Sequence, residues 1–194
     1  MLNHLKNKIR NSFKPIAKSL PLSPNLLTVV GLGISIIAAV MFGTGRVFIG
    51  GIFILLNGFF DILDGAVARE NGWMTPFGGL LDSVCDRYAD AIIFIGIIYG
   101  VIIGSISDPV LLNIPLWLWC VVAMIGSYIV SYTRARAEAA GGKDMNIGIA
   151  ERPERMIILT IGAFVGLLAP AIAVIVIITH ITVAQRLLHA RNTL

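Results

Sequence analysis

The segments DILDGAVAR (residues 61–69) and GGLLDSVCD (residues 78–86) decide the fold, because each places two aspartates in an otherwise apolar run. A carboxylate at the centre of a hydrocarbon layer costs roughly 2.5–3.5 kcal/mol on insertion scales, so ionisable groups in such segments indicate a functional site. On a helix, residues three or four positions apart share a face. Each segment therefore presents its pair of carboxylates on one helical stripe. The four aspartates are Asp61, Asp64, Asp82 and Asp86.

Two helices that meet along these stripes bring four carboxylates together. Four anions cannot all stay ionised in a low-dielectric setting without cations. All-oxygen ligands select hard ions, Mg²⁺ first, with Mn²⁺ or Ca²⁺ as alternatives. Two such ions clamp phosphoryl oxygens in displacement reactions. We therefore predict a site for two Mg²⁺ or Mn²⁺ ions, with metal ligands Asp61, Asp64, Asp82 and Asp86.

The remaining residues of the stripes suit a phosphorylated ligand. Gly65, Ala68 and Gly78 let a bulky group approach the backbone closely. Arg69 offers a planar fork that pairs with a diphosphate. Two other interpretations exist for the cluster: a buried ion-pair network that specifies helix packing, or a cation pathway. Four aspartates at these intervals, together with the arginine, favour a ligand site over both alternatives.

The pattern D-x2-D-G-x2-A-R-x8-G-x3-D-x3-D is met at every fixed position from Asp61 to Asp86. It resembles the signature of the CDP-alcohol phosphotransferases, integral membrane enzymes of phospholipid synthesis. The resemblance implies transfer of a phosphatidyl-type group from a CDP-linked lipid to an alcohol, with release of CMP. It also implies a homodimer and a set of CDP-lipid-binding residues: Asn25, Thr28, Gly65, Ala68, Arg69, Thr75 and Gly78. Helix capping by Asn25 and Thr28, and a plain loop hydroxyl at Thr75, remain alternatives.

Composition favours a membrane protein. The 194 residues are 57% hydrophobic and 13% charged, with a mean hydropathy of +0.87, whereas soluble domains average about 25% charged. A span needs about 20 apolar residues. We predict an all-α integral membrane protein with six transmembrane helices preceded by an N-terminal amphipathic interfacial helix. The predicted spans are 25–43, 47–68, 78–106, 114–137, 153–168 and 171–188.

The first twenty residues differ from the rest of the chain. Leu2, Leu5, Ile9 and Phe13 recur at helical spacing among lysines, so the segment lacks the continuous apolar core of a secretory signal. It is typical of an amphipathic helix that lies in the lipid headgroup layer. We therefore divide the chain into a juxtamembrane helix, residues 1–20, and a membrane domain, residues 21–194.

Basic residues predict the orientation in the cell membrane. They gather before the first span, after the second and fourth spans and at the C-terminal end, whereas the alternate connectors carry little positive charge. Both termini and the active site are therefore expected on the cytoplasmic side. Membrane lipids are expected partners, and nucleic acid is not.

A second basic cluster bears on the acceptor. RARAE (residues 134–138) ends the fourth predicted span and ERPER (residues 151–155) begins the fifth. Arginines from several helix ends suit a phosphate dianion, although positive-inside anchoring explains single arginines. Both blocks are similar to segments of phosphatidylinositol-phosphate synthases and their archaeal relatives, which join inositol 1-phosphate to a CDP-lipid. The predicted acceptor-phosphate ligands are Arg134, Arg136, Arg152, Arg155 and Arg186.

These observations predict a mechanism in which Asp86 takes the proton from the acceptor hydroxyl as general base. The expected acceptor is 1-myo-inositol 1-phosphate, and the lipid is CDP-diacylglycerol or CDP-archaeol. Glycerol 3-phosphate or serine are alternative acceptors for the same chemistry. A cation or proton transporter is a remote alternative, since transporters typically show paired broken helices or repeats, and neither is visible in the sequence.

Overall fold

The computed structural model describes residues 17–18, 20–109 and 111–194. Its regular elements in these ranges are α-helices, with one isolated bridge between Leu111 and Ile114. The helices are α2 (Pro24–Gly43), α3 (Val47–Glu70), α4 (Pro76–Ile102), α5 (Leu116–Ala139), α6 (Arg152–Phe164) and α7 (Leu168–Thr193).

Each predicted span overlaps one of these helices, and the ends differ by only a few residues. Four helices are long and apolar enough to cross a membrane, namely α2, α3, α5 and α7. The other two do not meet this standard. Helix α6 has 13 residues, about 20 Å at 1.5 Å per residue. Helix α4 carries Asp82, Asp86, Arg87 and Asp90 in its N-terminal and central turns. The prediction of an all-α fold is confirmed, and four of the six predicted spans coincide with helices that meet this standard of length and composition.

The predicted amphipathic helix at residues 1–20 lies almost entirely outside the described residues. Elsewhere the surface is rich in exposed large apolar side chains, as a lipid-facing surface would be. Examples are Val40 on α2, Ile95 on α4, Ile161 on α6 and Ile177 on α7.

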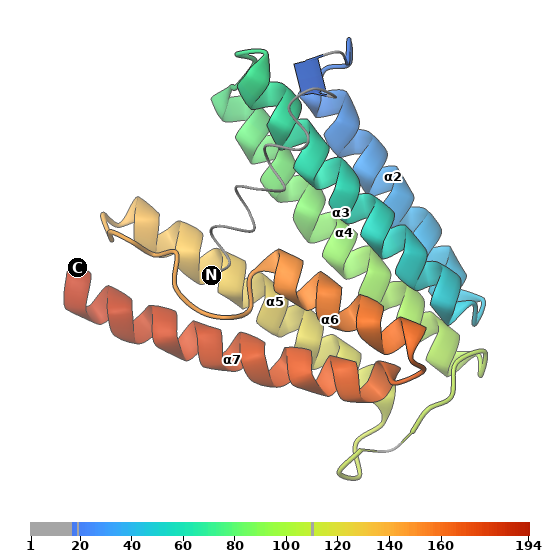
Figure 1. Ribbon diagram of the computed structural model, residues 1–194. Helices are drawn as coiled ribbons and strands as arrows, with labels where there is room; N and C mark the ends of the chain where they lie inside the picture. The colour runs from blue at the N-terminus through green and yellow to red at the C-terminus, as the bar shows by residue number, and fades with distance from the viewer. Residues whose placement is uncertain (1–16, 19, 110) are drawn as a thin grey trace.

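The helices form two groups (Figure 1). Helices α2, α3 and α4 run side by side, and α5, α6 and α7 form a second group that crosses the first. Contacts between α3 and α6 and between α4 and α5 join the groups. The C-terminal half of α3, the N-terminal half of α4 and the start of α6 consequently meet, and all the acidic motif residues lie at this junction.

Local sequence explains where α2 and α4 begin. Ser23 caps α2 by accepting a hydrogen bond from the Leu26 N–H at 3.3 Å, and Thr75 caps α4 by accepting one from the Gly78 N–H at 3.0 Å. A proline follows each cap, a position where its missing N–H costs nothing. Asn25 and Thr28 are therefore not the capping residues of α2, and their side chains are available for the site.

The three helices of the first group are held closely together. A Cβ added at Gly96 of α4 would lie 2.6 Å from the Cα of Ala39 in α2 and would also meet the Ala39 carbonyl oxygen. Only glycine permits this approach of the two backbones. Phe42 and Phe94 are fully buried beside it. The packing fixes the register of α2 against α4, and with it the position of Asn25 and Thr28 relative to Gly78.

Candidate active site

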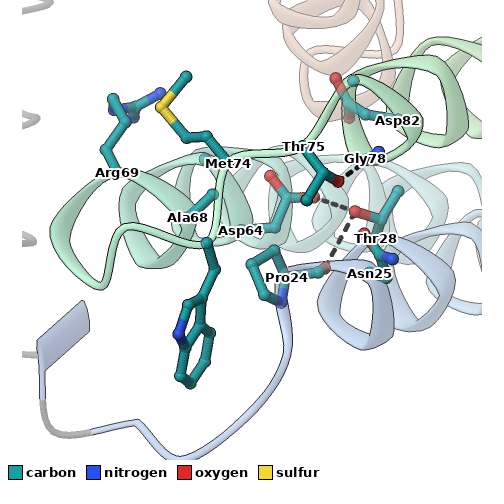
Figure 2. A pocket seen from close by; sticks show the side chains of 13 residues that line it. Pro24, Asn25, Thr28, Asp64, Ala68, Arg69, Met74, Thr75, Gly78 and Asp82 are labelled. Atoms are coloured by element: carbon teal, nitrogen blue, oxygen red, sulfur yellow. Dashed lines mark hydrogen bonds between the residues drawn. The ribbon is translucent and has the colours of Figure 1, made fainter.

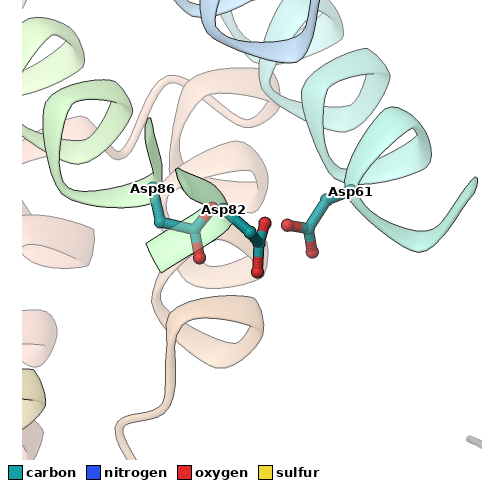
Figure 3. Close-up of side chains that lie close together, drawn as sticks. All are labelled: Asp61, Asp82 and Asp86. Atoms are coloured by element: carbon teal, nitrogen blue, oxygen red, sulfur yellow. The ribbon is translucent and has the colours of Figure 1, made fainter. Parts of the chain in front are cut away.

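Three aspartates from two helices face one another (Figure 3). Asp61 comes from α3, and Asp82 and Asp86 come from successive turns of α4. One carboxylate oxygen from each lies within 4.8 Å of the others. A compact set of carboxylate oxygens that is partly shielded from solvent fits a hard divalent cation such as Mg²⁺ or Mn²⁺.

A small cavity lies among the carboxylates, and all four motif aspartates line it. Asp64 is the fourth of them and is not part of the close trio. It is almost fully buried, and its Oδ2 accepts a hydrogen bond from Thr28 Oγ1 at 2.6 Å. Figure 2 shows this contact together with the approach of the same hydroxyl to the Pro24 carbonyl, at 3.1 Å. Thr28 therefore fixes the orientation of Asp64, as groups behind metal ligands commonly do.

A cavity of about 160 Å³ opens on one side of the carboxylates. All seven predicted CDP-lipid residues line it, and Asp64 and Asp82 form its inner end. The structure also adds four lining residues that the sequence pattern did not single out: Pro24, Trp73, Met74 and Gly79. Their position beside the motif in the chain was the only signal that could have identified them.

Two glycines keep this cavity open. A Cβ at Gly65 would lie 3.0 Å from Arg69 Nη1, and a Cβ at Gly78 would lie 3.1 Å from Thr75 Oγ1 and 3.3 Å from Asn25 Oδ1. A side chain at either position would push a polar group out of place. The absence of a side chain at Gly65 and Gly78 therefore leaves these polar groups in place at the cavity wall.

A second cleft, of about 400 Å³, adjoins the same carboxylate cluster and shares no lining residue with the first cavity. Asp86 lines it, together with four of the five predicted acceptor arginines: Arg134, Arg152, Arg155 and Arg186. Arg136 is exposed and does not line this cleft. Arg87, Ser83, Ser131, Glu138 and Glu151 complete the polar part of the lining and were not predicted.

Two of these arginines are buried by contacts within the protein. Arg155 donates to Asp90 Oδ2 at 2.6 Å and to the Ala150 carbonyl at 2.7 Å. Arg186 donates to the carbonyls of Val130 and Ile147 at 2.6 and 2.9 Å. Both guanidinium groups therefore tie the backbone walls of the cleft together, a role the sequence did not indicate, while they contribute positive charge to it.

Arg152 reaches further than the sequence predicted. Its Nη1 lies 3.0 Å from Asp61 Oδ1 and 2.7 Å from Asp86 Oδ1. Its Nε lies 3.2 Å from Asp90 Oδ1, and its Nη2 donates to Asn57 Oδ1 at 2.8 Å. The guanidinium is therefore inserted among the carboxylates rather than free in the cleft.

Asp90 and Asn57 are site residues that sequence reasoning missed. Asp90 follows Asp86 by four positions and Asn57 precedes Asp61 by four, so both continue the helical stripes already identified. That periodicity could have revealed them. Both are nearly fully buried.

Comparison with known proteins decides the family. Residues 21–188 match the family model described as CDP-alcohol phosphatidyltransferase. The chain belongs to this family. Its members are biosynthetic phosphotransferases, so the chain is an enzyme of this class, and the divalent-cation fit of its carboxylates agrees with the class.

Two relatives match this chain over nearly its whole length. The archaetidylinositol phosphate synthase of Pyrococcus horikoshii is 36% identical, over 100% of this chain and 98% of its own length. The phosphatidylinositol phosphate synthase of Mycobacteroides abscessus is 37% identical, over 96% of this chain and 84% of its own.

Solved structures agree with the fold. The Mycobacterium tuberculosis phosphatidylinositol phosphate synthase with CDP-DAG bound matches with a TM-score of 0.81 and 33% identity, covering 92% of each chain. The same enzyme in complex with manganese and citrate matches with a TM-score of 0.80 and 31% identity, covering 93% of this chain and 90% of that one.

Proposed function

We propose that this family member transfers the phosphatidyl or archaetidyl group of a CDP-lipid to 1-myo-inositol 1-phosphate and releases CMP. One observation carries the proposal. Two separate cavities adjoin one carboxylate cluster: the 160 Å³ cavity, here called the donor cavity, and an arginine-lined cleft. Asp82 lines the donor cavity and Asp86 lines the cleft. The names of the relatives support the same reaction.

The donor side suits the CDP moiety. Arg69 offers two parallel N–H donors to diphosphate oxygens. Asn25 and Thr75 place polar atoms near Gly78 at the cavity wall, where a nucleotide can approach the backbone closely. Divalent cations held by Asp61, Asp64, Asp82 and Asp86 supply positive charge to the diphosphate and to departing CMP.

The acceptor side suits a phosphate dianion. Arg134 extends into the cleft with 43% of its side chain exposed. Arg155 and Arg186 add fixed positive charge from the walls. A neutral acceptor such as serine would not require this concentration of arginines. Held there, the acceptor presents its hydroxyl to Asp86, the carboxylate at the inner end of the cleft.

The chemical step exchanges one P–O bond for another. Asp86 takes the proton of the acceptor hydroxyl, and the oxygen attacks the phosphorus that carries the lipid. A new P–O bond forms as the bond between that phosphorus and the bridging oxygen breaks. CMP leaves with the bonding electron pair. The proton stays on the Asp86 carboxyl until solvent in the cleft removes it.

We further propose that residues 21–194 form one membrane domain of six spans, with residues 1–20 as the amphipathic helix on its surface. In this topology α4 crosses beside α2 and α3, and the short α6 crosses beside α3 and α7. Both termini and the site then face the cytoplasm, and the enzyme acts in the cell membrane as a homodimer with two metal ions in each site.

The test is CMP release from the purified protein with a CDP-lipid and Mg²⁺, measured separately with inositol 1-phosphate, glycerol 3-phosphate and serine. We expect release with inositol 1-phosphate alone. Release only with another acceptor would retain the carboxylate chemistry and overturn the acceptor. Absence of release with all three would overturn the function.

A further inference from the structure

One guanidinium connects the two halves of the site. Arg152 and Asp86 line both the small cavity among the carboxylates and the arginine-lined cleft. Of the described residues, these two alone belong to both linings. Arg152 belongs to the first turn of α6, whereas the carboxylates that it contacts belong to α3 and α4. Its position therefore depends on how three helices meet.

Arg152 binds the same groups that a metal ion needs. Its Nη1 contacts Asp61 and Asp86, two of the three aspartates that converge on the candidate cation site. A divalent cation between these carboxylates would compete with Nη1 for Asp61 Oδ1 and Asp86 Oδ1 and would repel the guanidinium. Cation binding must therefore move Nη1.

The other end of the guanidinium is held more firmly. Nε contacts Asp90, whose side chain is only 4% exposed and whose second oxygen binds Arg155. Nη2 donates to Asn57, which in turn donates to the Gly31 carbonyl of α2 at 2.8 Å. These buried contacts hold Nε and Nη2. Because the guanidinium is planar and rigid, Nη1 leaves Asp61 and Asp86 only when the whole group tilts about the line through Nε and Nη2.

We propose that Arg152 is a positioning residue that couples cation binding to recognition of the acceptor phosphate. It neutralises Asp61 and Asp86 in the metal-free site; once cations take these carboxylates, Nη1 turns into the cleft and binds the acceptor's phosphate. Asp90 and Asn57 are the anchors about which it turns. The proposal deepens the proposed function and rests on it for the identity of the acceptor.

Two consequences distinguish this role from simple packing. The cation and a phosphate-like dianion must each tighten the binding of the other, by the same factor, because coupling between two sites is reciprocal. Loss of Arg152 must also make the bare carboxylates better cation ligands. A residue that only packed α6 against α3 would produce neither effect.

The experiment measures Mn²⁺ affinity by electron paramagnetic resonance in the purified full-length protein, with and without sulfate. Sulfate is a tetrahedral dianion that does not precipitate Mn²⁺. For the wild type we expect sulfate to tighten Mn²⁺ binding at least about fivefold, the lower end of typical couplings. Arg152→Gln should bind Mn²⁺ at least about fivefold more tightly without sulfate and lose the effect of sulfate.

Two further variants control the comparison. Arg46→Gln removes an equal charge at the other end of α3, where the residue is exposed, and should behave as wild type. Arg152→Lys keeps the charge but lacks the fork that spans Asp86, Asp90 and Asn57, so it should reduce the coupling. Wild-type Mn²⁺ affinity and wild-type coupling in Arg152→Gln would overturn the proposal.

The CMP assay separates this outcome from failure of the proposed function. Coupling that disappears in Arg152→Gln, in a protein that does not use inositol 1-phosphate, would support the role of Arg152 and reject the acceptor. Full activity with inositol 1-phosphate and unchanged coupling would reject the role of Arg152 alone.

Discussion

Nη1 of Arg152 lies 2.7 Å from Oδ1 of Asp86, so the carboxylate at the junction of the two cavities is neutralised by an arginine from another helix. A carboxylate in that ion pair is a poor proton acceptor, since the nearby cation stabilises its charged form. Base catalysis by Asp86 thus requires the guanidinium to withdraw.

Replacing Asp86 with Asn tests its role as base. We expect kcat to fall by about 10²–10⁴-fold, the usual contribution of general base catalysis. At saturating Mg²⁺, CDP-lipid affinity should change little, because Asp86 does not line the donor cavity. Radiolabelled CDP-lipid binding and CMP release would be measured on the same preparation. Retention of a tenth or more of the activity would argue against the assignment.

Gly65→Ala tests the donor cavity. The added methyl would lie 3.0 Å from Arg69 Nη1 and displace that flexible side chain from the wall. We expect KM for the CDP-lipid to rise on the order of tenfold, or about 1.4 kcal/mol of lost binding. Thermal stability should not fall, because alanine favours the helix over glycine by up to about 1 kcal/mol.

Gly58→Ala is the matched control in the same helix. A Cβ at Gly58 meets nothing within 4 Å. It should gain the same helix propensity and leave KM unchanged. An equal rise in KM for both variants would point to a general effect on α3 and would show that displacement of Arg69 is not the cause.

Arg134 and Arg136 provide a second matched pair. The sequence pattern predicts equal importance, but only Arg134 lines the cleft. Arg134→Gln should raise KM for inositol 1-phosphate about 10- to 100-fold, as expected when a hydrogen bond to a charged group worth about 1.5–3 kcal/mol is lost. Arg136→Gln should stay within about twofold, a change worth only about 0.4 kcal/mol. The reverse ranking would show that the cleft is not the acceptor site.

Asp90→Asn tests the buried anchor. The side chains of Asp90 and Arg155 are only 4% and 2% exposed and lie 2.6 Å apart. Removing one partner of a buried pair costs about 3–5 kcal/mol, because the other charge is left uncompensated. We expect a clear drop in the unfolding midpoint in detergent, measured by thermal denaturation.

The control for this stability measurement is Asp144→Asn in the α5–α6 connector. Asp144 is exposed, and surface substitutions of this kind usually change stability by no more than about 0.5 kcal/mol. A similar midpoint for both variants would mean that the Asp90–Arg155 pair does not stabilise the fold.

Sequence alone predicted the helices well, because long apolar runs and their interruptions are local properties. The starting points of α2 and α4 follow from Ser23-Pro24 and Thr75-Pro76, where a capping side chain is followed by a proline. The residues that line the 160 Å³ cavity could also be found from the sequence, since a regular helical spacing and a family resemblance mark seven of them. Most of them lie on α3 and α4, whose connector is only a few residues long.

The acceptor side was predicted less well. Arginine blocks indicate positive charge at a helix end, but not which guanidinium points inward. Arg136 and Arg134 lie two positions apart on α5, and such neighbours face different directions on a helix. The burial of Arg155 and Arg186 depends on carbonyls and carboxylates from other helices, which have no signature in the local sequence.

The sequence by itself determined an apolar helical chain, two helical stripes of carboxylates and a set of arginines at the helix ends. Only the tertiary structure decided which charges meet. Arg152 contacts Asp90 and Asp61 across 62 and 91 positions of the chain. Such pairs depend on the register and crossing of packed helices, which many distant contacts set together, and local periodicity carries no information about them.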